Sequence, residues 1–276
     1  MSSVDLSLGC FFIGMVLNVW LYGVVCLQLL VYFYHFRQDV KILKAAVTVL
    51  FLATTLNTVL TISFVYDDLV SNFGSATYSA AASPSFAALS TTTSFVALLV
   101  QLLSAWRIWR LSDREYFLDH AMPTVIAVVS IVSFACAVWT TVEVTRVKAF
   151  ADFQVFRVAV GVWLGMAAFA DVLITSSLIA KLSATRSGVD RIDKSVRVMV
   201  HIVFQTGLAT TAFAVVDLIL YLCSTATLDM IFNFPLANLY MLSLLSTLNA
   251  RITLRQSWRE SLHLDSGRAS ESPTFR

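Results

Sequence analysis

Residues 161–181, GVWLGMAAFADVLITSSLIAK, form an apolar stretch with one acid, Asp171, near the middle. At about 1.5 Å of rise per residue, a helix of this length spans a hydrocarbon core of about 30 Å. A carboxylate at such depth costs about 2.5 to 3.5 kcal/mol, so it avoids lipid. The stretch therefore predicts a transmembrane helix whose acid faces protein, water or a ligand.

Small residues share the face of Asp171 on this helix. At about 100° per residue, the acid falls within roughly one third of the helix circumference together with Gly161, Gly165, Ala168 and Thr175. Such a stripe lets a second helix approach closely. Two interpretations stay open: an ordinary packing seam with Asp171 hydrogen-bonded inside it, or a site for a ligand or a proton.

The composition indicates an integral membrane protein. Of the 276 residues, 58% are hydrophobic and 13% are charged, and the mean hydropathy is +0.79. This charge content is about half that of soluble domains. The net charge of +2 is small and is not gathered into a basic face, so we expect the lipid bilayer, and not nucleic acid, as a partner. The expected location is the plasma membrane or an endomembrane.

Apolar runs along the chain predict an all-α bundle of seven transmembrane helices. The first run continues to Tyr34, which is too long for the apolar core of a signal peptide, so we expect it to be retained. The predicted spans are 8–34, 42–66, 86–106, 122–141, 158–181, 198–223 and 230–252. They make up one domain, 1–252, and are followed by a tail, 253–276, with either a short amphipathic helix or only disordered chain.

The basic residues predict how the bundle is oriented. All but three of the 19 Lys and Arg residues fall in the first, third and fifth loops or in the tail. Because basic residues near the ends of spans stay on the cytoplasmic side, we expect the N-terminus outside and the C-terminus in the cytoplasm.

Four residues mark the predicted cytoplasmic face: Arg107, Arg110, Asn249 and Arg251. The arginines lie where basic side chains meet anionic lipid of the inner leaflet, which is worth about 1 kcal/mol per charge. The alternative is that this face, with the third and fifth loops, binds a cytosolic protein. Both interpretations stay open.

The sixth span is a second polar helix. Thr206, Thr210 and Asp217 share one region of its surface. Asp217 lies about 9 Å below the outer boundary and Asp171 about 20 Å, so we expect the acids one or two helical turns apart in depth. This offset disfavours a carboxylate pair that shares one proton, but it allows two steps of a polar track. Together with Thr175, these residues are the candidate ligand-binding set.

Six amide side chains also fall inside the predicted spans: Asn18, Gln28, Asn57, Gln101, Asn238 and Asn249. Hydrogen bonds between helices, at about 0.6 kcal/mol each, account for such residues without any ligand. A small wet cavity that they surround is the alternative interpretation.

The remaining reactive side chains form no recognisable site. The four Cys and four His residues lack metal-ligand spacing, so we expect neither a metal nor a cofactor. No nucleophile lies beside a base in the sequence, and we therefore do not expect an enzyme. Cys10 and Cys223 both lie near the predicted outer face and could pair only if their Cα atoms approach within about 7 Å.

Several strings along the chain carry a family resemblance: Tyr22-Gly23-Val24 with Gln28, Tyr32-Phe33 and Asp39; Gln101 to Trp109 with Leu111-Ser112; Asp171 with Leu178; Thr206-Gly207-Leu208; and Leu244 to Arg251. Together they resemble a fungal family of seven-helix membrane proteins that is catalogued only as a domain of unknown function. The resemblance implies the fold and a membrane location, but no activity. The chain departs from the family at Leu242-Ser243, where Asn-Ser is frequent, and this weakens the case for a polar site at that level.

Three functions are compatible with these features. The leading hypothesis is a receptor-like or sensory protein whose outer half binds a small, amphipathic ligand through Asp171 and Asp217. A small-molecule or proton-coupled transporter is the alternative, although seven spans leave one helix over in an inverted repeat. The third is a structural or partner-binding membrane protein in which every polar residue serves packing.

Overall fold

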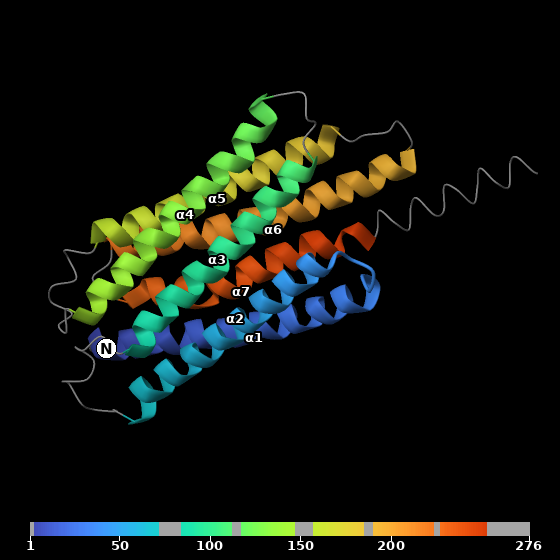
Figure 1. The fold of residues 1–276 in the computed structure, drawn as a ribbon. Coiled ribbons are helices and arrows are strands. Elements are labelled where there is room, and N and C mark those ends of the chain that lie inside the picture. Colours follow the sequence, from blue (N-terminus) through green and yellow to red (C-terminus); the bar gives the residue numbers. More distant parts are fainter. Residues whose placement is uncertain are drawn as a thin grey trace, which may run out of the picture.

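The computed structural model describes residues 3–71, 84–111, 117–146, 157–184, 190–223 and 227–252. The described residues form seven long α-helices, a short π-helix and a 3₁₀ turn, and no strand (Figure 1). The long helices are α1 (Ser3–His35), α2 (Lys41–Tyr66), α3 (Pro84–Leu111), α4 (Phe117–Arg146), α5 (Arg157–Ala184), α6 (Asp190–Cys223) and α7 (Met230–Asn249). The π-helix η1 (Asp67–Ser71) follows α2, and the turn η3 (Thr227–Asp229) precedes α7.

All seven helices are long and apolar enough to cross a membrane. The predicted all-α bundle of seven transmembrane helices is therefore confirmed. The helices continue beyond the apolar spans, because a backbone that is already hydrogen-bonded within a helix need not unwind where the lipid ends. Since α5 runs to Ala184 and α6 begins at Asp190, most of the predicted fifth loop, 181–197, is helical. The predicted tail, 253–276, lies outside the described residues.

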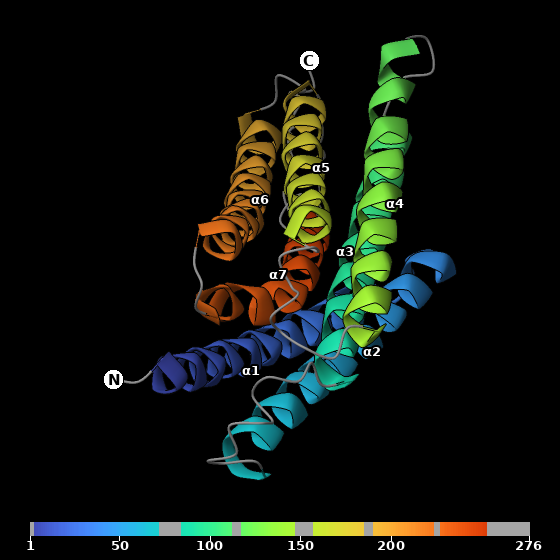
Figure 2. The same cartoon turned by 90° about the vertical axis from the view of Figure 1, so that its left-hand side faces the viewer.

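Helix α7 is the centre of the bundle. Its apolar window is 67% buried, against at most 44% for the other six helices. It packs against α1, α2, α3 and α6, and Figure 2 shows it between α1 on one side and the α5 and α6 pair on the other. Its mean hydropathy of 1.4 is the lowest of the seven, because a helix screened from lipid can carry polar side chains. The fold is therefore organised around α7.

The outward surface of the bundle is apolar. Trp20, Leu27 and Leu30 on α1 and Trp139 on α4 are each between 65% and 67% exposed. Large apolar patches of this kind are rare on proteins that face water, whereas lipid tails are as apolar as leucine. The exposed side chains therefore support a lipid bilayer as the environment.

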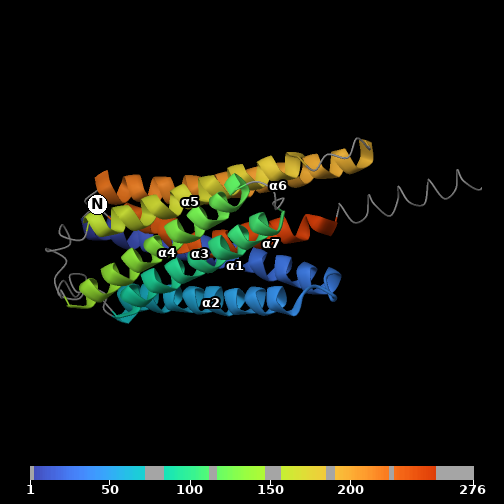
Figure 3. The ribbon, with the colours of Figure 1, turned by 45° about the horizontal axis from the view of Figure 1, so that its top comes forward.

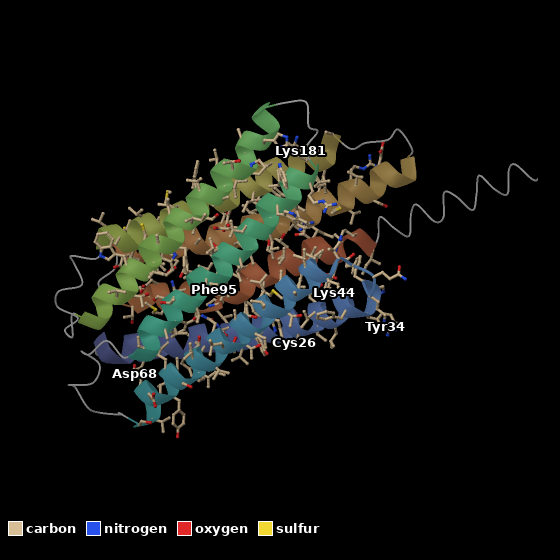
Figure 4. All side chains as sticks on the ribbon, in the orientation of Figure 1. Cys26, Tyr34, Lys44, Asp68, Phe95 and Lys181 are labelled. Atoms are coloured by element: carbon tan, nitrogen blue, oxygen red, sulfur yellow. The ribbon has the colours of Figure 1, made fainter. Side chains whose placement is uncertain are left out.

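The two ends of the bundle differ in charge. Successive helices run in opposite directions, so α1 begins at one end of the bundle and α7 finishes at the other (Figures 1 and 3). Figure 4 shows Lys44 and Lys181 toward the end where α1 finishes, and Asp68 toward the opposite end. The bias of basic residues among the predicted loops thus becomes a difference between the two ends of the folded bundle.

Candidate functional site

Asp171 lies inside the bundle, on α5. Its side chain is 6% exposed, so the expectation that this acid avoids lipid is confirmed. Gln101 on α3 donates from Nε2 to Asp171 Oδ1 at 3.0 Å and to the carbonyl oxygen of Ala167 at 3.3 Å. The second carboxylate oxygen, Oδ2, has no hydrogen-bond partner among the described residues. The carboxylate is therefore held on one side only.

Tyr240 on α7 joins this site. It is 2% exposed, and its hydroxyl lies beside the Asp171 carboxylate and within electrostatic range of Asp217. The hydroxyl is placed to donate to the Asp171 carboxylate, although neither it nor Asp171 Oδ2 makes a hydrogen bond of ordinary geometry within the described part of the chain. Tyr240 thereby connects the acid on α5 with the acid on α6.

Asp217 on α6 is the other buried acid, with 1% of its surface exposed. Asn233 on α7 donates from Nδ2 to Asp217 Oδ2 at 2.8 Å, while Oδ1 has no partner within the described ranges. Asn233 precedes Tyr240 by two helical turns, which is about 10 Å along the axis. Asp229, which precedes Asn233 in the chain, is 7% exposed and lies within electrostatic range of Asp217. A line of polar groups thus runs from Asp171 toward the start of α7.

Of the three predicted threonines, Thr175 lies at the contact between α5 and α6. The Thr206 hydroxyl donates to the Ile202 carbonyl oxygen at 2.9 Å, and the Thr210 hydroxyl donates to the Gly207 carbonyl oxygen at 3.0 Å, both within α6. Thr175 packs directly on Gly207, where an added Cβ would lie 2.1 Å from Thr175 Oγ1. The structure therefore shows Thr175 as a packing residue and the other two threonines bonded within α6, and their role in ligand binding stays a prediction.

The glycine stripe on α5 also faces α6, but with more space. A Cβ at Gly161 would lie 3.8 Å from Leu222, and a Cβ at Gly165 would lie 4.0 Å from Leu218, which are ordinary contact distances. The tightest approach of these two helices is instead at Gly207. The structure thus shows a packing seam on α5 with Asp171 hydrogen-bonded beside it, and a ligand or proton site at Asp171 stays a prediction.

The amides inside the spans make hydrogen bonds between helices, as one of the two interpretations predicts. Asn18 on α1 donates to the carbonyl oxygen of Phe234 on α7. Asn238 on α7 donates to Asn18 Oδ1 at 3.2 Å and to Thr58 Oγ1 on α2 at 3.3 Å. Asn57 on α2 donates to two threonine hydroxyls of α3. These bonds fasten α7 to α1 and α2 near its middle.

Two of the predicted cytoplasmic residues instead bind α1 and the turn after it. Asn249 donates from Nδ2 to Gln28 Oε1 at 2.6 Å and to the Gln28 carbonyl oxygen at 2.9 Å. Arg251 donates from Nη2 to Asp39 Oδ2 at 2.8 Å, and its guanidinium lies 4.6 Å from the centre of the Phe36 ring. These contacts fasten the end of α7 to the end of α1.

The other two predicted cytoplasmic residues lie at the end of α3. Arg110 is exposed, and its guanidinium lies over the Trp106 ring at 5.3 Å. Arg107 is half-buried and within electrostatic range of Arg251. Arg110 is therefore the residue of this set that is most open to a lipid headgroup or to another protein.

The described residues include candidate metal ligands and all four cysteines. Among them, no group of three His, Cys, Asp or Glu side chains is arranged to hold a metal ion. All four cysteines are free thiols, with Cys10 buried and Cys223 exposed. The disulfide between Cys10 and Cys223 that the sequence left open is absent.

Sequence reasoning missed Tyr240, Asn233 and Asp229. Tyrosine and asparagine near a span are ordinary in an interfacial belt or a packing contact, so neither residue type signals a site. One signal was available, because Asn233 and Tyr240 are seven residues apart and therefore share a face of α7. Only the place of α7 in the folded bundle shows that this face meets both acids.

Comparisons with known proteins cover part of the chain. No curated protein and no solved structure matches it. Residues 167–253, which include Asp171, Asp217, Tyr240 and Arg251, do match a family model. Over these residues, the chain is similar to a family of unknown function (DUF6534).

Proposed function

We propose that this chain is a non-catalytic, receptor-like or sensory multi-pass membrane protein that binds a small, amphipathic ligand among its helices. The observation that carries the proposal is the centre at Asp171, where groups from α3, α5 and α7 surround a buried carboxylate with one oxygen unpartnered in the described structure. An ionisable residue at this depth is expensive, which favours a function over packing alone.

Packing would be served as well by apolar side chains. A buried polar group without a hydrogen-bond partner costs about 1 to 3 kcal/mol. Among the described residues, Asp217 Oδ1 is such a group, and the Asp171 and Tyr240 oxygens face only each other, without ordinary hydrogen-bond geometry. Replacing buried polar groups by apolar ones is often neutral or stabilising. This cost supports a role in which a ligand supplies the missing partners.

Helix α7 offers a route from this site to the far end of the bundle. Tyr240 lies beside the acids, and Asn249 and Arg251 fasten the end of the same helix to α1 and the turn after it. If α7 can adopt two arrangements in the bundle, a ligand that binds one of them more tightly raises the population of that arrangement. The contacts at the end of α7 then change with it. Arg110, exposed at that end, is where we expect a cytosolic protein to respond.

The orientation and the source of the protein belong to the same proposal. We expect the N-terminus outside and the C-terminus in the cytoplasm, because the basic residues follow the positive-inside rule. We also expect a plasma membrane or endomembrane location and relatives in fungi. Protease protection of tags at the two termini of the full chain would test the orientation, and protection of both tags on one side would contradict it.

Thermal unfolding of the purified full-length chain tests ligand binding. Small amphipathic compounds are screened, and a ligand at about 100 times its Kd adds about 2.7 kcal/mol of stability. We expect the stabilisation to be lost in Asp171→Asn and weakened in Asp217→Asn, and to persist in Asp68→Asn, a half-buried aspartate on η1 that serves as the matched control. An unchanged response in both site variants would rule out these acids. Capture of a cytosolic protein without any stabilising compound would favour the structural or partner-binding role.

A small-molecule or proton-coupled transporter is the second candidate. The polar line from Asp171 through Tyr240 to Asp217 favours it, because carriers move ions past successive buried acids. A transporter predicts flux in liposomes that hold the purified chain, and a receptor predicts none. Uptake that is abolished in Tyr240→Phe would replace the receptor proposal with this one.

A further inference from the structure

We infer that a groove on the outward surface of α1 binds a sterol. The groove has a volume of about 530 Å³, within the range of pockets that accept small molecules, and it is open on the side that faces lipid. It is lined by residues of α1 and of the turn after it: Leu30, Val31, Phe33, Tyr34, His35 and Arg37. None of these residues belongs to the centre at Asp171, so the inference goes beyond the proposed function.

The groove is apolar along its length and polar at one end. Leu30 is 67% exposed, Val31 39% and Phe33 38%, so its apolar part consists of side chains that the bundle leaves open to lipid. Tyr34, which Figure 4 shows at the end of the bundle where α1 finishes, is 72% exposed, and Arg37 is exposed just beyond it. A sterol has the same order, with a flat apolar body and a single hydroxyl at one end.

The spacing of three residues in the groove agrees with this ligand. Leu or Val, then Tyr, then Lys or Arg, with about one to five residues between successive members, is a pattern proposed for contact with cholesterol. Leu30, Tyr34 and Arg37 fit it, and of the eight tyrosines in the chain only Tyr32 and Tyr34 precede a basic residue at this distance. Tyr32 is 0% exposed and donates to Asp39 Oδ2 at 3.4 Å, which leaves Tyr34 to reach a ligand. The pattern is weak by spacing alone, and it becomes informative here because all three members line one groove.

Contacts within the chain hold the polar end of the groove in place. His35 donates from Nδ1 to the Val31 carbonyl oxygen at 3.1 Å, and its ring meets the Tyr34 ring edge to face, with 5.0 Å between the centroids. Lys44 donates from Nζ to the Arg37 carbonyl oxygen. The Tyr34 hydroxyl and the Arg37 guanidinium have no hydrogen-bond partner among the described residues. Both are therefore available to a sterol hydroxyl, which accepts from the guanidinium and bonds to the phenol.

Rigidity favours a sterol over the acyl chain of a phospholipid. A groove that is open to lipid contacts its ligand on one side only, so the cost of ordering the ligand weighs heavily in the binding free energy. An acyl chain loses rotational freedom along its whole length when it lies in a groove, whereas the fused rings of a sterol have little to lose. The groove therefore distinguishes the two although both are apolar.

Photolabelling of the full-length chain tests the inference. The chain is placed in phosphatidylcholine vesicles with a trace of a photoreactive cholesterol analogue, and unlabelled cholesterol competes for the site. We expect the label within residues 27–37, and competition by cholesterol but not by its 3α-hydroxyl epimer. The cholesterol concentration for half-maximal competition is expected to rise about tenfold in Tyr34→Ala and about threefold in Arg37→Ala, as for the loss of a ring contact with a hydrogen bond and of a hydrogen bond alone. Tyr66→Ala, which changes a 57% exposed tyrosine with no basic residue closely after it, is the matched control and keeps the parent value.

Three results would overturn the inference: labelling that Tyr34→Ala leaves unchanged, equal competition by the epimer, and displacement by phosphatidylserine as effective as by cholesterol. Each would reduce the groove to ordinary lipid contact. Tyr34→Ala and Arg37→Ala change exposed side chains, so both variants are expected to fold.

The proposed function fails separately from this inference. Labelling that Asp171→Asn abolishes and Tyr34→Ala keeps would place the sterol at the buried acid, which overturns the inference and supports the receptor proposal. Labelling that follows Tyr34, together with no stabilising compound that depends on Asp171, supports the inference and removes the receptor proposal. If no labelling competes with cholesterol, only the sterol groove is lost.

Discussion

Gly207 sets how closely α5 and α6 approach, and Gly207→Ala tests that contact. The new Cβ would lie 2.1 Å from Thr175 Oγ1, 2.8 Å from Cγ2 and 3.0 Å from Cβ, so the threonine cannot avoid it by rotation alone. Overpacking of a close contact costs about 1 to 3 kcal/mol. For a chain of this size, that loss lowers Tm by roughly 3 to 10 °C.

The same clash predicts a rescue. Thr175→Ala removes Oγ1 and Cγ2 and leaves only the Cβ contact at 3.0 Å. The double variant Gly207→Ala with Thr175→Ala is therefore expected to recover most of the lost stability. The coupling energy between the two positions, from the double-mutant cycle, is then about as large as the cost of Gly207→Ala itself.

Two other glycines are matched controls for this experiment. A Cβ at Gly165 would meet its nearest atom at 4.0 Å, and a Cβ at Gly23 would meet none within 4 Å. Alanine at either position is expected to leave Tm within about 2 °C of the parent chain, because nothing has to move. Intrinsic tryptophan fluorescence during heating in detergent measures all these variants. An equal Tm for Gly207→Ala and Gly165→Ala would refute this explanation of the contact. So would a double variant, Gly207→Ala with Thr175→Ala, whose Tm is no higher than that of Gly207→Ala alone.

Three further predictions follow from contacts elsewhere in the bundle. Breaking the ion pair between Arg251 and Asp39, whose side chains are 27% and 10% exposed, is expected to cost about 1 kcal/mol, and a double-mutant cycle repeated at high salt should give a smaller coupling. Asn238→Leu removes donors to α1 and α2 and is expected to cost about 1 to 2 kcal/mol in thermal unfolding; an unchanged Tm would contradict a role in fastening α7. Cys223, which is exposed, is expected to react with maleimide in the folded chain, while Cys10, which is 4% exposed, is protected. A mass measurement under non-reducing conditions that finds a disulfide between Cys10 and Cys223 would contradict the structure there.

Hydropathy was sufficient to predict the seven helices, because the length and apolar composition of each span alone decide whether it can cross the lipid. The inward position of Asp171 was predictable for the same reason, since the cost of a carboxylate in lipid does not depend on which helix lies next to it. The offset in depth between Asp171 and Asp217 also agrees with their partners, because Asn233 precedes Tyr240 by two turns on α7. These predictions need only the rise of a helix and the thickness of the bilayer.

Properties that depend on two helices at once were not predictable from spacing. The amphipathic pattern of α5 shows a small-residue stripe, but the tight contact depends on Gly207 in another helix. A hydrogen bond between helices was predicted for Asn249, but its partner Gln28, and the pairing of Arg251 with Asp39, are shown only by the packing of α7 on α1. The central place of α7 was hidden as well, because the least apolar span gave the weakest membrane signal.

The contacts between α1 and α7 have a consequence for how the chain is made. Asn18 and its partners in α7 are separated by 216 to 220 residues, so the first helix enters the bilayer long before its polar side chain can be satisfied. Until the last helix arrives, that amide has to be sheltered by the insertion machinery or by a chaperone. A chain truncated before Met230 would keep this amide without its partners on α7.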